Sequence, residues 1–270
     1  MTLPPHEMMT DASAADAPAT APSELPRRVK ILPVLFVLIF GTYLPLRPLQ
    51  YWIFPALSRF GWSQPSITGV ATIFVQATIT VTVLLVVHFW ERLPMRSIGI
   101  VRFAATDLAL GVAAFVGIGV IEGLALPLVL LVLTGSHDWG IASSDAHQFK
   151  LISQWPWPLM LATAVSAGVY EEIWSRGYAV ERLEALTHST IAAAAVALTL
   201  DVGAHVPFWG IRYAILIAPC QVVLLGLYLW RRRLWPCVVA HVLWDAACPI
   251  AFALTWLLAT THAIHATWRL

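Results

Sequence analysis

Charged side chains are scarce in this chain. Of its 270 residues, 16 are Lys or Arg and 15 are Asp or Glu, whereas 59% are hydrophobic and the mean hydropathy is +0.76. A soluble domain of average composition is about 25% charged, so this composition excludes an ordinary soluble protein. The net charge of +1 gives no general attraction to nucleic acid, and we expect no nucleic-acid partner.

Three further features are missing from the sequence. Its three cysteines, Cys220, Cys237 and Cys248, have neither CxxC nor zinc-type spacing, so we expect buried free thiols. The sequence has no HExxH, the helical motif of zinc proteases. Residues 1–29 have neither a long apolar run nor the basic-then-apolar order of a secretory signal peptide, and their composition predicts a disordered tail.

Long apolar stretches dominate the rest of the chain. A membrane-spanning helix needs about 20 predominantly apolar residues. Residues 30–270 therefore predict one all-α domain, a polytopic transmembrane bundle of seven or eight membrane helices. The expected helices cover approximately 31–43 with a continuation over 49–57, 67–89, 108–133, 157–180, a short helix ending near 205, 211–230, and 234–263 as one kinked or two short helices. Pro127 is expected to kink the helix over 108–133.

Basic residues between the apolar stretches predict the orientation. They fall in four places along the chain: Arg27, Arg28 and Lys30; Arg92, Arg96 and Arg102; Arg182; and Arg231, Arg232 and Arg233. Alternating the loops places all four on one side, which the positive-inside rule assigns to the cytosol together with the N-terminus. Arg47 and Arg59 fall on the other side and count against this assignment. We expect a multi-pass protein of the plasma membrane, in contact with membrane lipids.

Glu171 and Glu172 are adjacent within the apolar stretch 157–180, and Arg176 follows one turn later. A charge at the bilayer centre costs about 2.5–3.5 kcal/mol on insertion scales, so intramembrane charges indicate functional sites. Residues four apart share a helix face, which predicts that Glu172 pairs with Arg176. Glu171 is rotated about 100° away and has no cation within its own turn. A desolvated carboxylate of this kind suits a general base that works near neutral pH.

Two more polar pairs interrupt later apolar stretches at the same spacing. Asp201 and His205 are four residues apart, as are His241 and Asp245. Three helices with such groups predict a hydrophilic cavity inside the bundle. Glu122 is a further intramembrane acid, and the sequence leaves open whether it pairs with a basic group or lines this cavity.

The run Glu171-Glu172-Ile-Trp-Ser-Arg176-Gly-Tyr resembles the EExxxRG signature of the CPBP family, the CAAX-protease and bacteriocin-processing (Abi-type) intramembrane glutamic endopeptidases. His205 falls at the histidine of the family's second motif, FxxxH, and His241 at the histidine of its third, HxxxN. The resemblance covers roughly residues 90–250 and includes the three motifs in order.

The resemblance implies an endopeptidase that hydrolyses a membrane-associated or C-terminal-signal peptide without a cofactor. Its substrate would be a peptide or a lipidated protein. Glu171 would activate a water that His205 helps to position, and His241 with Asp245 would stabilise the oxyanion.

Two residues depart from the family's pattern, while Glu172 and Arg176 would support the geometry of the site. Asp201 replaces the phenylalanine of FxxxH and adds an acid beside the motif's histidine; a hydrogen bond to that histidine is one explanation. Asp245 replaces the asparagine of the third motif, and an ionised aspartate cannot donate to an oxyanion. Asp245 is then protonated, orients the neighbouring histidine, or leaves a weaker oxyanion hole.

Other interpretations stay open at this point. Glu171, His205 and His241 also form a ligand set of the catalytic-zinc type, although the resemblance implies metal-independent hydrolysis. A catalytically silent scaffold or immunity protein is one alternative, to which the departures at Asp201 and Asp245 add some weight. A small proton-coupled transporter could use the same acids and histidines as a relay, but the sequence shows no inverted repeat.

Overall fold

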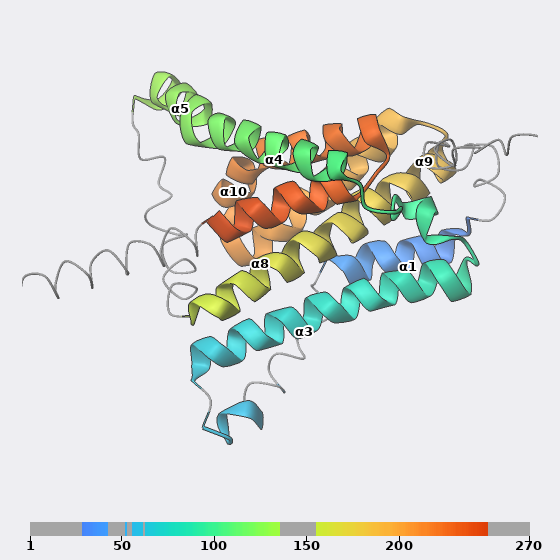
Figure 1. Ribbon diagram of the computed structural model, residues 1–270, viewed down its shortest axis with the longest axis horizontal. Coiled ribbons are helices and arrows are strands. Elements are labelled where there is room, and N and C mark those ends of the chain that lie inside the picture. Colours follow the sequence, from blue (N-terminus) through green and yellow to red (C-terminus); the bar gives the residue numbers. More distant parts are fainter. Residues whose placement is uncertain (1–28, 43–51, 53–55, 62, 136–154, 248–270) are drawn as a thin grey trace, which may run out of the picture.

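The computed structural model describes residues 29–42, 52, 56–61, 63–135 and 155–247, and within these residues all regular structure is helical (Figure 1). The predicted all-α class is therefore confirmed. Cys220 and Cys237 are buried free thiols, as predicted. Nearly all of the predicted tail, the 49–57 continuation for the most part, and the end of the chain with Cys248 lie outside the described residues.

The longer helices follow the predicted apolar stretches. They are α1 (Ile31–Gly41), α3 (Gln64–Leu85), α4 (Ala105–Val120), α5 (Leu126–Thr134), α8 (Trp157–Glu171), α9 (Glu181–Thr187), α10 (Thr190–Arg231) and a final helix over 235–247. Shorter elements connect or extend them: the π-helical segments η2 (Val86–Trp90), η4 (Ile121–Ala125) and η5 (Glu172–Val180), and the 3-10 turn η3 (Met95–Ile98).

Three of the described helical stretches are long and apolar enough to cross a membrane. They are Ser66–Trp90, Ala105–Leu133 and Thr190–Arg231. Several apolar helices of this kind indicate an integral membrane protein. The count of seven or eight spans stays a prediction.

Two departures from α geometry occur where the sequence predicts a break. η4 widens the helix directly before Pro127, whose missing N–H and ring disfavour a regular turn. In α10, Gly210 has φ 82° and ψ 164°, so the helical run bends there, between the helices predicted to end near 205 and to begin at 211. Positive φ is accessible to glycine at little cost.

The segment that carries the adjacent glutamates lies at the centre of the bundle. α3 packs along α8, while α1 and α10 both contact η5 (Figure 1). Every residue of η5 is buried. The charged side chains of η5 are therefore enclosed by apolar helices, which lowers the dielectric around them.

The structure corrects the prediction that Arg182 is a loop charge. Its side chain is 0% exposed, and its Nε lies 2.9 Å from Oε2 of Glu91. The guanidinium also donates to the carbonyl and hydroxyl oxygens of Ser97 at 3.0 and 2.9 Å, and the Tyr178 hydroxyl donates to Glu91 at 2.7 Å. Arg182 thus links the segment after η2 to α9 and η5 through buried hydrogen bonds. The predicted orientation in the membrane then depends on the other basic residues.

Candidate active site

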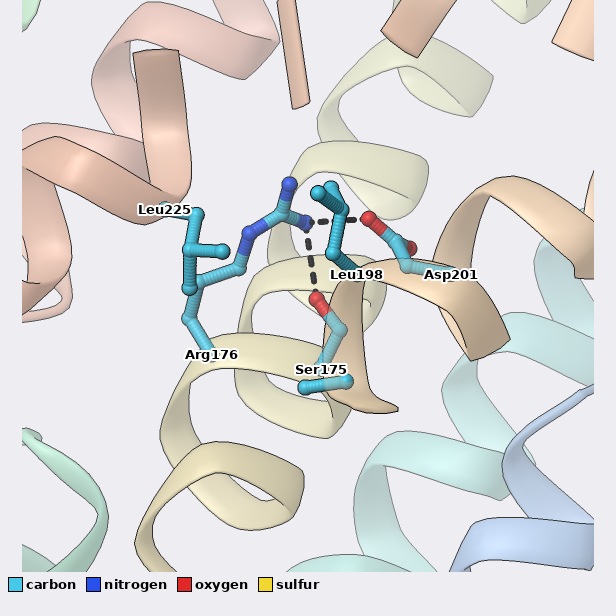
Figure 2. Close-up of a pocket in the computed structure, with 6 residues that line it drawn as sticks. Ser175, Arg176, Leu198, Asp201 and Leu225 are labelled. Atoms are coloured by element: carbon cyan, nitrogen blue, oxygen red, sulfur yellow. Dashed lines mark hydrogen bonds and ion pairs between the residues drawn. The ribbon is translucent and has the colours of Figure 1, made fainter. Parts of the chain in front are cut away.

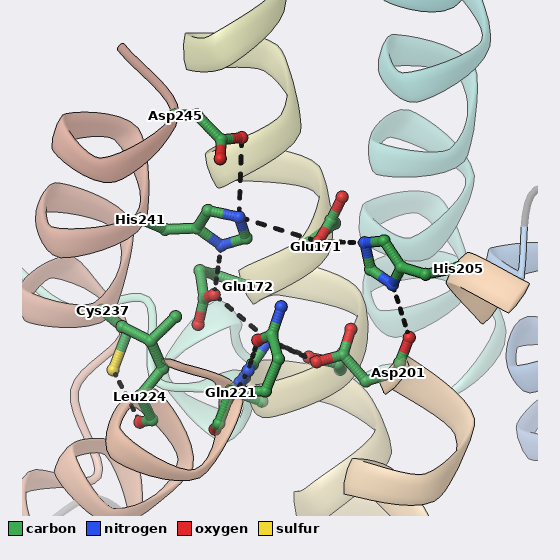
Figure 3. Close-up of polar contacts among 11 residues, drawn as sticks. Glu171, Glu172, Asp201, His205, Gln221, Leu224, Cys237, His241 and Asp245 are labelled. Atoms are coloured by element: carbon green, nitrogen blue, oxygen red, sulfur yellow. Dashed lines mark hydrogen bonds and ion pairs between the residues drawn. The ribbon is translucent and has the colours of Figure 1, made fainter. Parts of the chain in front are cut away.

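Three helical segments bring the predicted site residues together (Figure 3). Glu171 is the last residue of α8, and Glu172 is the first of η5. α10 carries Asp201 and His205, and the final helix over 235–247 carries His241 and Asp245. All six side chains lie in one continuous set of polar contacts.

The Glu171 carboxylate lies between two imidazole rings (Figure 3). Its Oε2 is 3.8 Å from Nε2 of His205 and 3.7 Å from Nε2 of His241. Both distances exceed a hydrogen bond, and this buried oxygen has no hydrogen-bond partner among the described residues. Two histidines from other helices therefore face Glu171, and among the described residues no donor lies within hydrogen-bond distance of its Oε2.

The other ring nitrogen of each histidine, Nδ1, lies within hydrogen-bond distance of an oxygen acceptor. Nδ1 of His205 lies 2.9 Å from the carbonyl oxygen of Asp201, and Nδ1 of His241 lies 2.7 Å from Oε1 of Glu172. A carbonyl and an ionised carboxylate only accept hydrogen bonds, so we assign a proton to both Nδ1 atoms. Both rings consequently present Nε2 to Glu171.

Glu172 and Arg176 form the predicted pair, with 3.2 Å between Oε1 and Nη1. Arg176 has more partners than the sequence indicates. Its Nη1 donates to Oγ of Ser175 at 2.7 Å and lies 2.9 Å from Oδ2 of Asp201 (Figure 2). Its Nη2 donates to the carbonyl oxygen of Gln221 at 3.3 Å and also to the Gln221 side-chain oxygen. The sequence analysis did not identify Gln221 as a site residue. The one sequence feature that could have indicated it is its position as a polar amide within an apolar stretch.

Asp201 and Asp245 have different surroundings. The bond from Asp201 to His205 uses the backbone carbonyl, not the carboxylate, which faces Arg176 instead. Asp245 is the more open of the two, since its side chain is 34% exposed, and its Oδ2 lies 3.7 Å from Nε2 of His241. The extra acid of the second motif is therefore part of the buried charge cluster, and its carboxylate makes no hydrogen bond to the His205 ring.

Glu122 lies in η4 and is partly buried. One of its carboxylate oxygens is buried without a hydrogen-bond partner among the described residues, and within the same residues no cation pairs with it. Of the two alternatives, pairing with a basic group finds no support in this part of the chain.

Among the described residues, no group of three or more His, Cys, Asp or Glu side chains is placed to hold a metal ion. The predicted zinc alternative was the set Glu171, His205 and His241. Their polar atoms face one another, but the three side chains do not form a metal-binding group.

The fold and the site define a class: integral membrane proteins of packed helices whose interior holds paired glutamates beside two histidines from other helices. Residues 153–247, which include all of these side chains, match the family model described as Type II CAAX prenyl endopeptidase Rce1-like. This segment is a domain of the Rce1-like CAAX prenyl endopeptidases, within the CPBP family that the motifs predict. Neither a curated protein nor a solved structure matches the chain.

Proposed function

We propose that the chain is an intramembrane endopeptidase in which Glu171 activates the hydrolytic water. The observation that carries the proposal is the buried Oε2 of Glu171, which lies between the Nε2 atoms of His205 and His241 and has no hydrogen-bond partner in the described part of the chain. The membership of residues 153–247 in an endopeptidase family supports hydrolysis of a peptide bond.

The first step uses Glu171 and His205. With its proton on Nδ1, a neutral His205 presents a lone pair on Nε2, so two acceptors face each other at 3.8 Å. A water between them donates one hydrogen to the carboxylate and the other to the ring. As its oxygen bonds to the carbonyl carbon of the substrate, the water gives its first proton to Glu171.

The second step needs a hydrogen-bond donor for the carbonyl oxygen as it becomes negative. His241 donates from Nε2 when it carries a proton on both ring nitrogens. Glu172 at 2.7 Å from Nδ1 and Asp245 at 3.7 Å from Nε2 are the carboxylates that stabilise this imidazolium. Asp245 thus acts as a carboxylate beside His241. When the C–N bond breaks, Glu171 returns its proton to the leaving amine.

The substrate we propose is the C-terminal segment of a lipidated protein or a membrane-associated peptide. The description of the matched family supports a prenylated C-terminus. The apolar helices around the site support delivery of such a substrate from the lipid phase. On the basic residues other than Arg182, we propose a plasma-membrane location with a cytosolic N-terminus.

Cleavage by the purified chain in lipid vesicles tests the proposal. The substrates are a farnesylated CAAX peptide and a library of C-terminal peptides. Glu171→Gln should lower the rate by about 10²–10⁴-fold, the usual contribution of a general base, and His205→Ala and His241→Ala should also lose activity. Glu184→Gln, in α9, removes a carboxylate outside the site and, assayed below its own Tm, should retain activity. Cleavage that survives Glu171→Gln, or no cleavage of any peptide by the wild type, refutes the proposal.

Two further measurements separate the chemical alternatives. Asp245→Asn should lower the rate by about tenfold if the residue acts as a carboxylate; an unchanged or higher rate would assign it the role of a neutral donor. If the proposed mechanism holds, the purified chain keeps its activity when a chelator is added. Loss of activity in the chelator that zinc restores would instead support a metal site.

A further inference from the structure

Asp201 stands where the second motif of the resembled family has phenylalanine, and its side chain is buried behind the proposed catalytic residues. We propose that Asp201 is a positioning residue: its carboxylate holds Arg176, and Arg176 thereby keeps Glu172 against His241. The inference deepens the proposed function and depends on it for its kinetic consequences, whereas the pairing itself does not.

The guanidinium of Arg176 is shared between two carboxylates; Figure 2 shows its contact with Asp201. Nη1 lies 2.9 Å from Oδ2 of Asp201 and 3.2 Å from Oε1 of Glu172. The three side chains are at most 2% exposed, so water screens their attraction weakly. Because Asp201 is the nearer anion, Arg176 is not drawn onto Glu172 alone.

Glu172 uses the same oxygen for two contacts. Its Oε1 faces Nη1 of Arg176 at 3.2 Å and Nδ1 of His241 at 2.7 Å. The shorter contact is the one to the histidine, and it fixes the direction of the opposite nitrogen toward Glu171. Any shift of Arg176 therefore moves Glu172, and with it the ring proposed to stabilise the oxyanion.

Charge balance points to the same link. In their ionised forms, Asp201 and Glu172 carry two buried negative charges against the one positive charge of Arg176. The imidazolium form of His241 is the second cation that balances this cluster, and it is also the form proposed to donate to the oxyanion. With phenylalanine in place of Asp201, Arg176 and Glu172 would balance each other, and the imidazolium would depend on Glu171 and Asp245, each 3.7 Å from its Nε2.

Among the described residues, Arg176 is the main partner of this carboxylate. Neither oxygen of Asp201 has a hydrogen bond of good geometry to the described residues, so the ion pair with Arg176 is the interaction that offsets its desolvation. Its contact with His205 uses the backbone carbonyl and survives any side-chain substitution. Side-chain variants of Asp201 therefore test the path through Arg176 without removing the bond to His205.

The kinetic test compares Asp201→Asn with Asp201→Glu on the farnesylated CAAX peptide. Asp201→Asn should lower kcat by about ten- to a hundredfold, as removal of partners that orient metal-bound histidines does, with KM changed less than about twofold. Asp201→Glu restores the charge and should retain more activity. Thr199→Ala is the control, because Thr199 is exposed on the same helix.

A double-mutant cycle separates positioning from a merely structural role. In a Glu172→Gln background the link to His241 is already broken, so adding Asp201→Asn should change kcat less than about twofold. Losses that multiply, or a fall in KM alone, would overturn the inference.

Thermal unfolding tests the pairing without any substrate. Asp201→Asn should lower the Tm of the wild type but leave it unchanged, or raise it, in an Arg176→Met background, where the carboxylate has lost its cation. Arg176→Lys, which keeps one charge but loses the fork, supplies the second background if Arg176→Met does not fold; the loss there should be smaller. Equal losses in all backgrounds refute the pairing, even if the wild type cleaves normally. A confirmed pairing with no cleavage refutes the proposed function instead.

Discussion

The buried ion pair between Arg182 and Glu91 gives a prediction that needs no substrate. Arg182→Met removes three hydrogen bonds, at 2.9 Å to Glu91, 3.0 Å to the Ser97 carbonyl and 2.9 Å to its hydroxyl. Of the bonds made by described residues, Glu91, itself 6% exposed, then keeps the one from the Tyr178 hydroxyl at 2.7 Å. A buried carboxylate with no cation is among the more costly defects in a folded protein.

The size of the effect follows from this burial. Removing one partner of a buried pair typically costs about 3–5 kcal/mol, mostly because the other charge stays desolvated. For a chain of this size, such a loss lowers Tm on the order of 10 °C. The double variant Glu91→Gln/Arg182→Met removes both charges, while the glutamine can still accept from Tyr178. It should recover at least half of the loss.

The assay is thermal unfolding in detergent micelles, with cleavage as a second readout if the chain proves active. Arg96→Met is the matched control, since Arg96 lies exposed in the same segment and should change stability by less than about 0.5 kcal/mol. If Arg182→Met costs no more than Arg96→Met, or if the double variant is as unstable as the single one, the pair does not hold the segment after η2.

Two other predictions concern packing and pH. Gly168→Ala should lower the free energy of unfolding by about 1–3 kcal/mol, because the new Cβ would lie 2.6 Å from Cγ2 and 3.0 Å from the backbone nitrogen of Val242. Gly117→Ala is the control. Its Cβ would meet no atom within 4 Å, so it should be neutral or stabilising in the same unfolding assay. Glu184→Gln should lower Tm at pH 7, because it removes an ion pair of 2.6 Å with Arg232. Burial raises the pKa of Glu184, but the bonds from Arg232 and a neighbouring hydroxyl outweigh burial and hold it below the ordinary 4.5. Because the pKa of Glu184 is lowered in the folded protein, its ion pair stabilises the fold at high pH, and this stabilisation is lost as the pH falls through that pKa. The Tm difference between the wild type and Glu184→Gln should therefore close below pH 4.5. A difference that stays constant with pH would contradict this assignment.

The helices themselves could be predicted closely from the sequence. The stretches expected over 67–89 and 108–133 correspond to Ser66–Trp90 and Ala105–Leu133. This success has a simple cause, since a long apolar run can satisfy its backbone in lipid only as a helix. The π-helical turns were not predicted, because one extra residue in a turn leaves the apolar pattern almost unchanged.

Local spacing also predicted part of the site. The pair Glu172–Arg176 lies on one helical segment, and its four-residue spacing is sufficient to bring the charges together. The order of motifs indicated that His205 and His241 would join Glu171, but spacing along the chain carries no information on which ring nitrogen faces which carboxylate. The bond between His241 and Glu172 was not foreseen for this reason.

The sequence by itself determined the class of fold and the residues with costly charges, because apolar length and local helix spacing are properties of single segments. Only the tertiary structure decided which of these charges belong to each other. Asp201 meets Arg176 and Glu91 meets Arg182 across different helices. In a low-dielectric interior the packing of the helices selects the partner of each charge. Arg182 therefore forms a structural ion pair, and Asp201 belongs to the charge cluster of the candidate site.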